Sequence, residues 1–311
     1  MQIRVLTHAK TLGELTISGD GQFDSPGYCA KYCCYTVVEN TTGYALEFHV
    51  LQKGQVEGEL EKHACREALT KTTETHGLNV KKLVTDRHPG ITKMVREDFK
   101  SIEHETDIWH FAKCIKKKLT KLGKKHPAIK EWEKDIVNHF WFCCQKCDGN
   151  SDLLLELWHS HLLHISNQHT WKRQHLLKKK YGCFIGTGKK YPRPFQYVTA
   201  CFHDTLTKKA SRMKNWLKVD SPEFEELVKL FTNTRLCNEM RMCKSFQHTG
   251  GIENLHSVKN KYLPKRKHHS MECHIVSMML VCLEHNEHLD ARKDNKFAKP
   301  LGPNVPEKTC F

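Results

Sequence analysis

The sequence has no apolar run long enough to span a membrane, and residues 1–13 lack the apolar core of a signal peptide. We therefore predict no membrane-spanning helix and no membrane partner. Because no export signal is visible, we interpret the fifteen cysteines as reduced intracellular thiols rather than as a disulfide framework. Some of them could bind a metal. The sequence also shows no repeat of fixed period.

Acidic residues are few relative to basic ones. The 311 residues contain 50 Lys and Arg against 35 Asp and Glu, so the net charge is +15 before any of the 22 His binds a proton. This excess favours a polyanionic partner, with nucleic acid as the leading class and an anionic membrane as a distant second. The hydrophobic content of 39% is enough for a substantial core in one or two domains.

The first third of the chain alternates between strand and helix patterns. Period-two alternation and β-branched residues indicate strands, whereas apolar residues every three or four positions indicate helices. We predict strands at 14–20, 32–38, 44–52, 80–86 and 104–109, and helices at 57–75 and 89–99. This order of elements predicts a mixed α/β core with βαβ connections.

The middle of the chain loses the strand pattern. All six tryptophans lie between Trp109 and Trp216, which is enough large apolar surface for a helical subdomain with its own core. A further apolar helix is predicted at about 275–286. We divide the chain into part of the core at 14–110, an all-α insertion at 111–246, helices completing the core at 247–293, and a disordered tail at 294–311.

Three acidic residues occupy positions that suggest one site. Asp20 comes late in the first predicted strand, Asp86 ends the fourth, and Glu253 stands at the start of a helical segment. Ligands of open α/β sheets gather at the carboxyl ends of central strands. Carboxylates are suitable ligands for Mg²⁺, and two such ions can activate a nucleophile and stabilise the leaving oxygen of a phosphodiester.

Each acid also has a structural interpretation when taken alone. Asp20 beside glycine fits a turn, Asp86 before a helix fits a cap, and Glu253 fits a surface charge. His256, three residues after Glu253, lies on the same helix face. It could contact phosphate or orient the carboxylate, and it could equally pack inside the fold.

Clusters of basic residues recur along the chain after residue 115. One cluster alone is more often a solvated helix face, but repetition favours phosphate contact, with binding that falls steeply as salt rises. The predicted DNA-binding residues are Lys116, Lys117, Lys118, Lys265, Arg266 and Lys267.

A second metal pattern suggests zinc. Cys144-x-x-Cys147 and His164-x4-His169 provide ligand types and inner spacings that suit tetrahedral Zn²⁺, although the gap between the pairs is slightly long. Under the alternative interpretation, these cysteines are small buried residues on a helix and the histidines are a local enrichment. Both interpretations remain open from the sequence.

Four short motifs stand in order along the chain: Gly19-Asp20-Gly21-x-x-Asp24-Ser25-Pro26-Gly27, Val84-Thr85-Asp86-Arg87-His88-Pro89, Asp107-x-Trp109-His110 and Glu253-x-x-His256-Ser257. Together they resemble animal DDE/DDD-type cut-and-paste transposases and proteins derived from them. The Mutator-like and Kolobok-like sets look most similar. The resemblance runs from about residue 15 to about residue 290, and four ordered motifs are more specific than any one of them.

This resemblance implies an RNase H-like fold, with a mixed five-stranded sheet, flanking helices and a long all-α insertion before the last acidic residue. It also implies that Asp20, Asp86 and Glu253 are the catalytic, metal-binding triad for Mg²⁺ or Mn²⁺. The implied partner is DNA, the implied compartment is the nucleus, and such enzymes commonly act as homo-oligomers. Asp24 and Asp107 fall in motifs to which it gives no role.

One departure concerns the N-terminus. Transposases of this kind usually carry an N-terminal zinc-dependent module that recognises transposon ends, whereas the first predicted strand here begins about fourteen residues from Met1. We therefore expect either a fragment of a longer protein or a remnant catalytic domain.

Three functions compete on this basis. The first is a transposase catalytic domain, or its descendant, that cleaves and joins DNA. The second is a domesticated, non-catalytic DNA- or chromatin-binding protein. The third is a cellular nuclease of the RNase H type.

Overall fold

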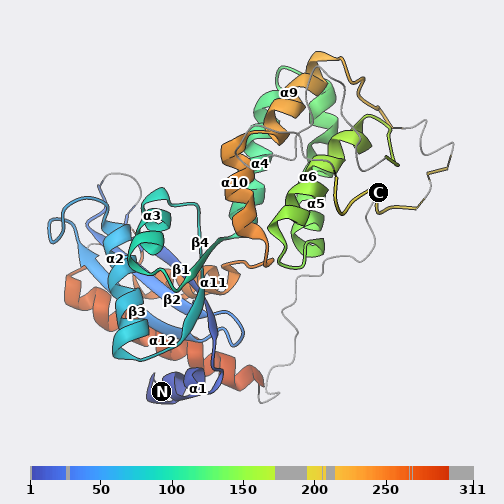
Figure 1. Ribbon diagram of the computed structural model, residues 1–311. Coiled ribbons are helices and arrows are strands. Elements are labelled where there is room, and N and C mark those ends of the chain that lie inside the picture. The colour runs from blue at the N-terminus through green and yellow to red at the C-terminus, as the bar shows by residue number, and fades with distance from the viewer. Residues whose placement is uncertain are drawn as a thin grey trace. The chain divides into compact units, whose positions relative to one another are not determined.

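The computed structural model describes residues 2–25, 29–171, 195–204, 206–207, 214–265, 267 and 269–293. The described residues form two compact units. We call the unit that lies within residues 1–107 and 248–293 the sheet unit, and the one within residues 108–247 the helical unit. Each is described by itself below (Figure 1).

The sheet unit contains a five-stranded mixed sheet in the order β3-β2-β1-β4-β5. Strand β1 pairs antiparallel with β2 and parallel with β4, so it joins the hairpin half of the sheet to the parallel half. Strand β3 pairs antiparallel with β2, and β5 pairs parallel with β4. The strands are β1 (Leu15–Phe23), β2 (Tyr32–Glu39), β3 (Ala45–Gln52), β4 (Val80–Thr85) and β5 (Glu103–Thr106).

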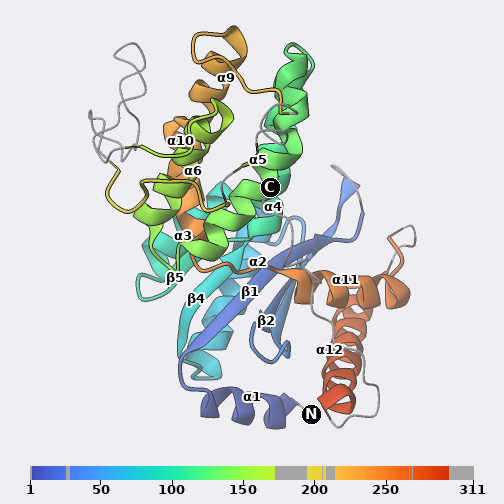
Figure 2. The same ribbon diagram turned by 90° about the vertical axis from the view of Figure 1, so that its right-hand side faces the viewer.

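Helices cover both faces of this sheet (Figures 1 and 2). One face packs its apolar residues against α1, α2 and α3, and the other packs against α11 and α12. A π-helical turn, Lys71–Thr75, continues α2. The helices are α1 (Gln2–Thr11), α2 (Leu60–Thr70), α3 (Pro89–Asp98), α11 (Gly250–Tyr262) and α12 (Met271–Lys293).

Local sequence explains several of these boundaries. Gly77 has a φ of 62°, a conformation that glycine adopts without strain, and it follows the turn that ends α2. Pro89 occupies the first turn of α3, where its missing N–H costs nothing. The Nδ1 atom of His88 accepts a hydrogen bond from the Ile91 N–H at 3.2 Å and so caps this helix.

The helical unit has its own core. Trp158 stacks on Phe231 in this core, with ring centroids 4.0 Å apart. All six tryptophans belong to this unit, so tryptophan fluorescence reports on it alone. Its helices are α4 (Ile108–Gly123), α5 (Pro127–Lys146), α6 (Ser151–Ile165), α9 (Pro222–Phe231) and α10 (Thr234–Met240), followed by the 3₁₀ turn Arg241–Cys243.

The predicted α/β class is confirmed, as is the mixed five-stranded sheet with flanking helices. The fifth strand was predicted too long, because Ile108 and Trp109 begin α4 instead of continuing β5. Helix α1 was not predicted. The predicted tail at 294–311 lies outside the described residues. Among the described residues, no helix is both long and apolar enough to cross a lipid bilayer.

Candidate functional site

Asp20 lies within strand β1, opposite Thr36 of β2, so it is not a turn residue. Its side chain is half-buried and contacts two groups. Oδ1 accepts a hydrogen bond from the Gly21 N–H at 2.9 Å, and Oδ2 lies 3.4 Å from Nδ1 of His256 on α11. The His256 side chain is largely buried, and this contact anchors α11 beside β1.

Glu61, in the first turn of α2, brings a second carboxylate to β1. A Cβ atom added to Gly21 would lie 2.5 Å from Cγ of Glu61 and 2.9 Å from its Oε1. Glycine at position 21 is therefore required for this close approach. Glu61 was missed in the sequence, although it lies four residues before the buried Cys65 and so extends the buried face of α2.

Asp86 follows β4 directly and is half-buried. Because His88 caps α3, the structure does not support the interpretation of Asp86 as its cap. Ser18 of β1 pairs with Val84 of β4, so Asp20 and Asp86 each lie two residues beyond a paired position. The two aspartates thus end up at the same level of two adjacent parallel strands.

The electrostatics of Glu61 show that these three acids share one environment. Burial, which is the largest cause, and the negative charges of Asp86, Asp20 and Glu59, in that order, together raise the pKa of Glu61 to about 8. Nε2 of His88 lies 4.0 Å from Oε2 of Glu61. The neighbouring negative charges favour a bound cation, whereas burial disfavours charge of either sign.

Glu253 is placed differently. It lies in the first turn of α11, one turn before His256, and its side chain is exposed. It is not among the acids whose charge raises the pKa of Glu61. Among the described residues, no three carboxylates bring their oxygens within 4.8 Å of one another. Glu61 therefore lies near enough to Asp20 and Asp86 to respond to their charges, and the role of Glu253 stays a prediction.

The two remaining motif aspartates have structural contacts. Oδ1 of Asp24 accepts hydrogen bonds from the backbone N–H groups of Lys31 at 2.9 Å and Tyr32 at 3.1 Å. Asp107 is buried, and its Oδ2 accepts from the Thr249 N–H at 2.8 Å and from the Thr249 hydroxyl. Asp24 thus links the end of β1 to the start of β2, and Asp107 fixes the residue that precedes α11.

The predicted basic residues are exposed where they are described. Lys116, Lys117 and Lys118 lie on α4, and Lys265 and Lys267 follow α11. Arg266 lies outside the described residues. Exposed lysines are available to phosphate groups, but DNA contact by these residues stays a prediction.

The predicted zinc ligands are corrected in part. Cys144 and Cys147 are buried, and the Cys147 thiol donates to the backbone carbonyls of Cys144 and Lys244 at 3.3 and 3.1 Å. These two cysteines are packing residues, in agreement with the alternative interpretation. His164 and His169 do lie together, but their neighbours are Cys201 and His203. Cys201 and His203 could not be predicted as partners from the sequence, because Cys201 is 32 residues from His169, which is too far for a recognisable ligand spacing.

No protein-family model matches the chain, and no curated protein matches its sequence. The function must therefore be inferred from the site itself.

Proposed function

We propose that this chain is the catalytic domain of a DNA transposase, or of a protein derived from one, with an RNase H-like fold. In this proposal it cleaves phosphodiester bonds and transfers DNA strands in the nucleus with the help of Mg²⁺ or Mn²⁺. The observation that carries the proposal is that Asp20 and Asp86 lie at the same level of two adjacent parallel strands, with Glu61 of α2 near enough for both charges to raise its pKa.

The sheet topology supports the fold assignment. An antiparallel hairpin joined through β1 to two parallel strands, in the order β3-β2-β1-β4-β5, is the arrangement expected of RNase H-like domains. Helix α2 connects the hairpin to β4, and α11 packs on the opposite face from α2. In such a sheet, acids on β1 and after β4 lie where a ligand binds.

The donor set fits a hard divalent cation. Carboxylate oxygens are the ligands that Mg²⁺ takes in addition to water and phosphate oxygens, and the raised pKa of Glu61 indicates that positive charge is favoured here. Asp20 and Asp86 would hold the metal, with Glu61 beside them. When bound, the metal would activate the attacking oxygen and stabilise the leaving oxygen.

The remaining residues of the site have positioning tasks in this proposal. His256 contacts Asp20 and fixes the orientation of its carboxylate. Asp107 holds Thr249 and with it the start of α11. Glu253, exposed in the first turn of that helix, is available as the third acid of the triad. The lysines of α4 supply contacts to the DNA backbone.

The test is metal-dependent nicking and strand transfer by the full chain, compared with the Asp20→Asn variant. We expect activity with Mg²⁺ or Mn²⁺ in the wild type, and a loss of at least about a hundredfold in Asp20→Asn, which corresponds to about 2.7 kcal/mol of barrier. Asp24→Asn is the matched control. It lies four residues further on and keeps the oxygen that accepts the two backbone N–H groups.

Three outcomes would lead away from this proposal. Equal activity in wild type and Asp20→Asn would reject the assigned site. Salt-dependent DNA binding without metal-dependent cleavage, unchanged by Glu253→Ala, would instead favour the non-catalytic DNA-binding protein. Cleavage restricted to RNA–DNA hybrids would favour the nuclease of the RNase H type.

A further inference from the structure

Four side chains of types that can bind a metal meet within the helical unit. His164 lies in the last turn of α6, and His169 follows that helix. Cys201 and His203 lie in the described segment 195–204. One ligand atom from each residue lies within 4.8 Å of the others, and among the described residues this is the one such group of His, Cys, Asp and Glu.

The distances within this cluster match the edges of a coordination tetrahedron. Zn–N bonds of about 2.0–2.1 Å and a Zn–S bond of about 2.3 Å place nitrogens about 3.3 Å apart and sulfur about 3.6 Å from each nitrogen. Nε2 of His203 lies 3.3 Å from Nδ1 of His164 and 3.2 Å from Nδ1 of His169. Sγ of Cys201 lies 3.6 Å from each of these two Nδ1 atoms.

The outer hydrogen bonds of two imidazoles direct their lone pairs inward. Nδ1–H of His203 donates to the Asp204 carbonyl at 2.7 Å, which leaves Nε2 without a proton. Nε2–H of His169 donates to Oδ1 of Asn167 at 3.1 Å, which leaves Nδ1 without one. With both rings neutral, two lone pairs at 3.2 Å repel each other unless a proton or a metal ion lies between them. Such outer partners are typical of histidines that bind metals.

We propose that His164, His169, Cys201 and His203 bind one Zn²⁺ in a closed, structural site. Three imidazoles and one thiolate suit Zn²⁺, and four protein ligands leave no open position for a substrate. A blue-copper centre would instead need two histidines and a cysteine in a trigonal arrangement with a weak axial ligand. Here a third imidazole fills the fourth corner.

The site joins two segments that are distant in sequence. Residues 169–171 pair with 199–201 through an antiparallel bridge between Thr170 and Ala200. Oε1 of Glu156 on α6 accepts the backbone N–H groups of Tyr197 at 2.7 Å and Val198 at 2.8 Å. The zinc ion would add a third link between residues 151–171 and the segment 195–204.

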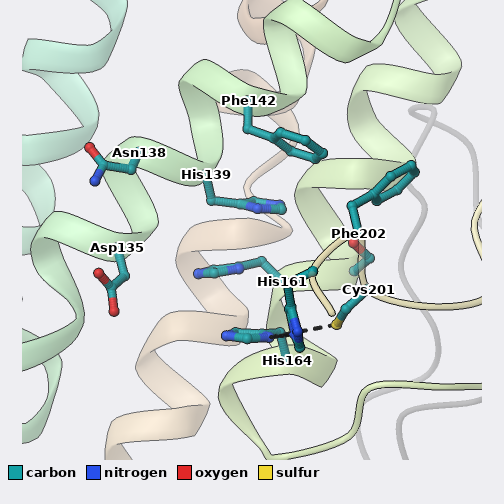
Figure 3. A pocket seen from close by; sticks show the side chains of 10 residues that line it. Asp135, Asn138, His139, Phe142, His161, His164, Cys201 and Phe202 are labelled. Atoms are coloured by element: carbon teal, nitrogen blue, oxygen red, sulfur yellow. Dashed lines mark hydrogen bonds between the residues drawn. The ribbon is translucent and has the colours of Figure 1, made fainter. Parts of the chain in front are cut away.

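The surroundings provide an optical reporter. Figure 3 shows the side chains of His139, His161 and His164 above one another, with Cys201 beside His164. These residues line a cavity of about 90 Å³. The Trp216 ring lies 5.5 Å from the ring of His164 and 5.4 Å from that of His169, measured between centroids. An absorbing metal ion in this site is therefore close enough to quench tryptophan fluorescence.

The test begins with the metal content of the full chain purified from zinc-supplemented cells. We expect one zinc per chain in the wild type and in Cys144→Ala, the matched control from the rejected ligand set. In Cys201→Ser we expect zinc retention to fall at least about tenfold. In protein loaded with Co²⁺, the wild type should show tetrahedral d–d absorption, a thiolate charge-transfer band and quenched tryptophan fluorescence.

A conservative variant keeps the test informative if Cys201→Ser does not fold. Cys201→His should retain Co²⁺ with its d–d bands but lose the thiolate charge-transfer band. The proposal is overturned if the wild type contains no zinc and gives no tetrahedral Co²⁺ spectrum. It is also overturned if the charge-transfer band survives in Cys201→His, or if Cys144→Ala removes the metal instead.

Discussion

Gly19 and Gly21 flank Asp20, and at each of them the absence of a Cβ atom makes room for a neighbouring side chain. A Cβ atom at Gly19 would collide with the Tyr35 hydroxyl, and one at Gly21 would collide with the Glu61 side chain. Neither glycine has a positive φ, so both are needed for space rather than for backbone conformation. The two glycines thus make room for Tyr35 and Glu61 on one face of the sheet, whereas the Asp20 side chain points to the other face, where it contacts His256.

Gly21→Ala tests this close approach. The new methyl group would force Glu61 away from β1, and overpacking of this kind costs about 1–3 kcal/mol. We expect this loss in the free energy of unfolding of the sheet unit, followed by far-UV circular dichroism, together with at least about a tenfold loss of metal-dependent cleavage.

Gly251→Ala is the control for this substitution. A Cβ atom there would meet only Val38 Cγ1 at 3.9 Å, an ordinary contact, and Gly251 also has no positive φ. We expect this variant to unfold and cleave as the wild type does. If Gly21→Ala behaved like Gly251→Ala, the geometry assigned to Glu61 would be wrong.

Site residues could be predicted from the sequence where a local pattern places them, but not where tertiary packing does. Asp20 and Asp86 could be found because strand patterns place them late in predicted strands. Glu61, by contrast, becomes part of the site only through the packing of α2 over Gly21. Cys201 and His203 lie near His164 because Thr170 and Ala200 form an antiparallel bridge. No sequence spacing predicts such a bridge.

At the scale of elements, α6 is the centre of the helical unit. Twelve of its fifteen residues are buried, including three histidines and a glutamate. The C-terminal carbonyl of α9, on Phe231, accepts hydrogen bonds from Nε1 of Trp158, Nε2 of His159 and Sγ of Cys237 at 3.3, 3.0 and 3.2 Å. Buried polar groups of α6 thus satisfy the end of a neighbouring helix.

The buried imidazole of His159 should make the free energy of unfolding depend on pH. Burial lowers the pKa of His159 to about 4, so the folded protein keeps it neutral while the unfolded chain protonates it near pH 6.5. The stability it contributes is present above pH 6.5 and is lost as the pH falls toward 4. Between pH 7 and pH 5 we expect His159 to account for a loss of about 2 kcal/mol.

His159→Gln provides the comparison, because it removes the titrating group and keeps a donor for Phe231. Denaturant unfolding followed by tryptophan fluorescence, which reports on the helical unit, should show a smaller loss between pH 7 and pH 5 in the variant. The same loss in both proteins would contradict the assignment.

The order of elements could be predicted better than their ends. Strands β1 to β4 alternate or are rich in β-branched residues, and their predicted positions agree with the structure to within a few residues. Strand β5 was overextended, since Ile108 and Trp109 look like strand residues although they start a helix. Helix α1 was missed because it buries only Val5 and Ala9 and so has a weak periodic pattern.

At the scale of the whole molecule, the net charge of +15 is the main predictor of the partner. Each lysine that neutralises a phosphate releases counterions, which adds about 0.9 to the slope of log affinity against log salt. Lys116, Lys117 and Lys118 are exposed on α4.

Replacement of all three lysines by glutamine should lower that slope by about 2–3 in duplex DNA binding. Lys229→Gln is the control, because its ammonium group already pairs with Glu226 at 2.6 Å. We expect the control to leave the slope unchanged. An unchanged slope in the triple variant would exclude these lysines from the DNA interface.

The most direct test of the central claim is Mn²⁺ binding to the zinc-loaded full chain, measured by the loss of the free-ion paramagnetic resonance signal. We predict that the wild type binds Mn²⁺ at pH 7.5, and that Asp20→Asn combined with Asp86→Asn lowers the affinity at least about tenfold, or about 1.4 kcal/mol. Equal Mn²⁺ binding by the two proteins would contradict a cation site at these carboxylates.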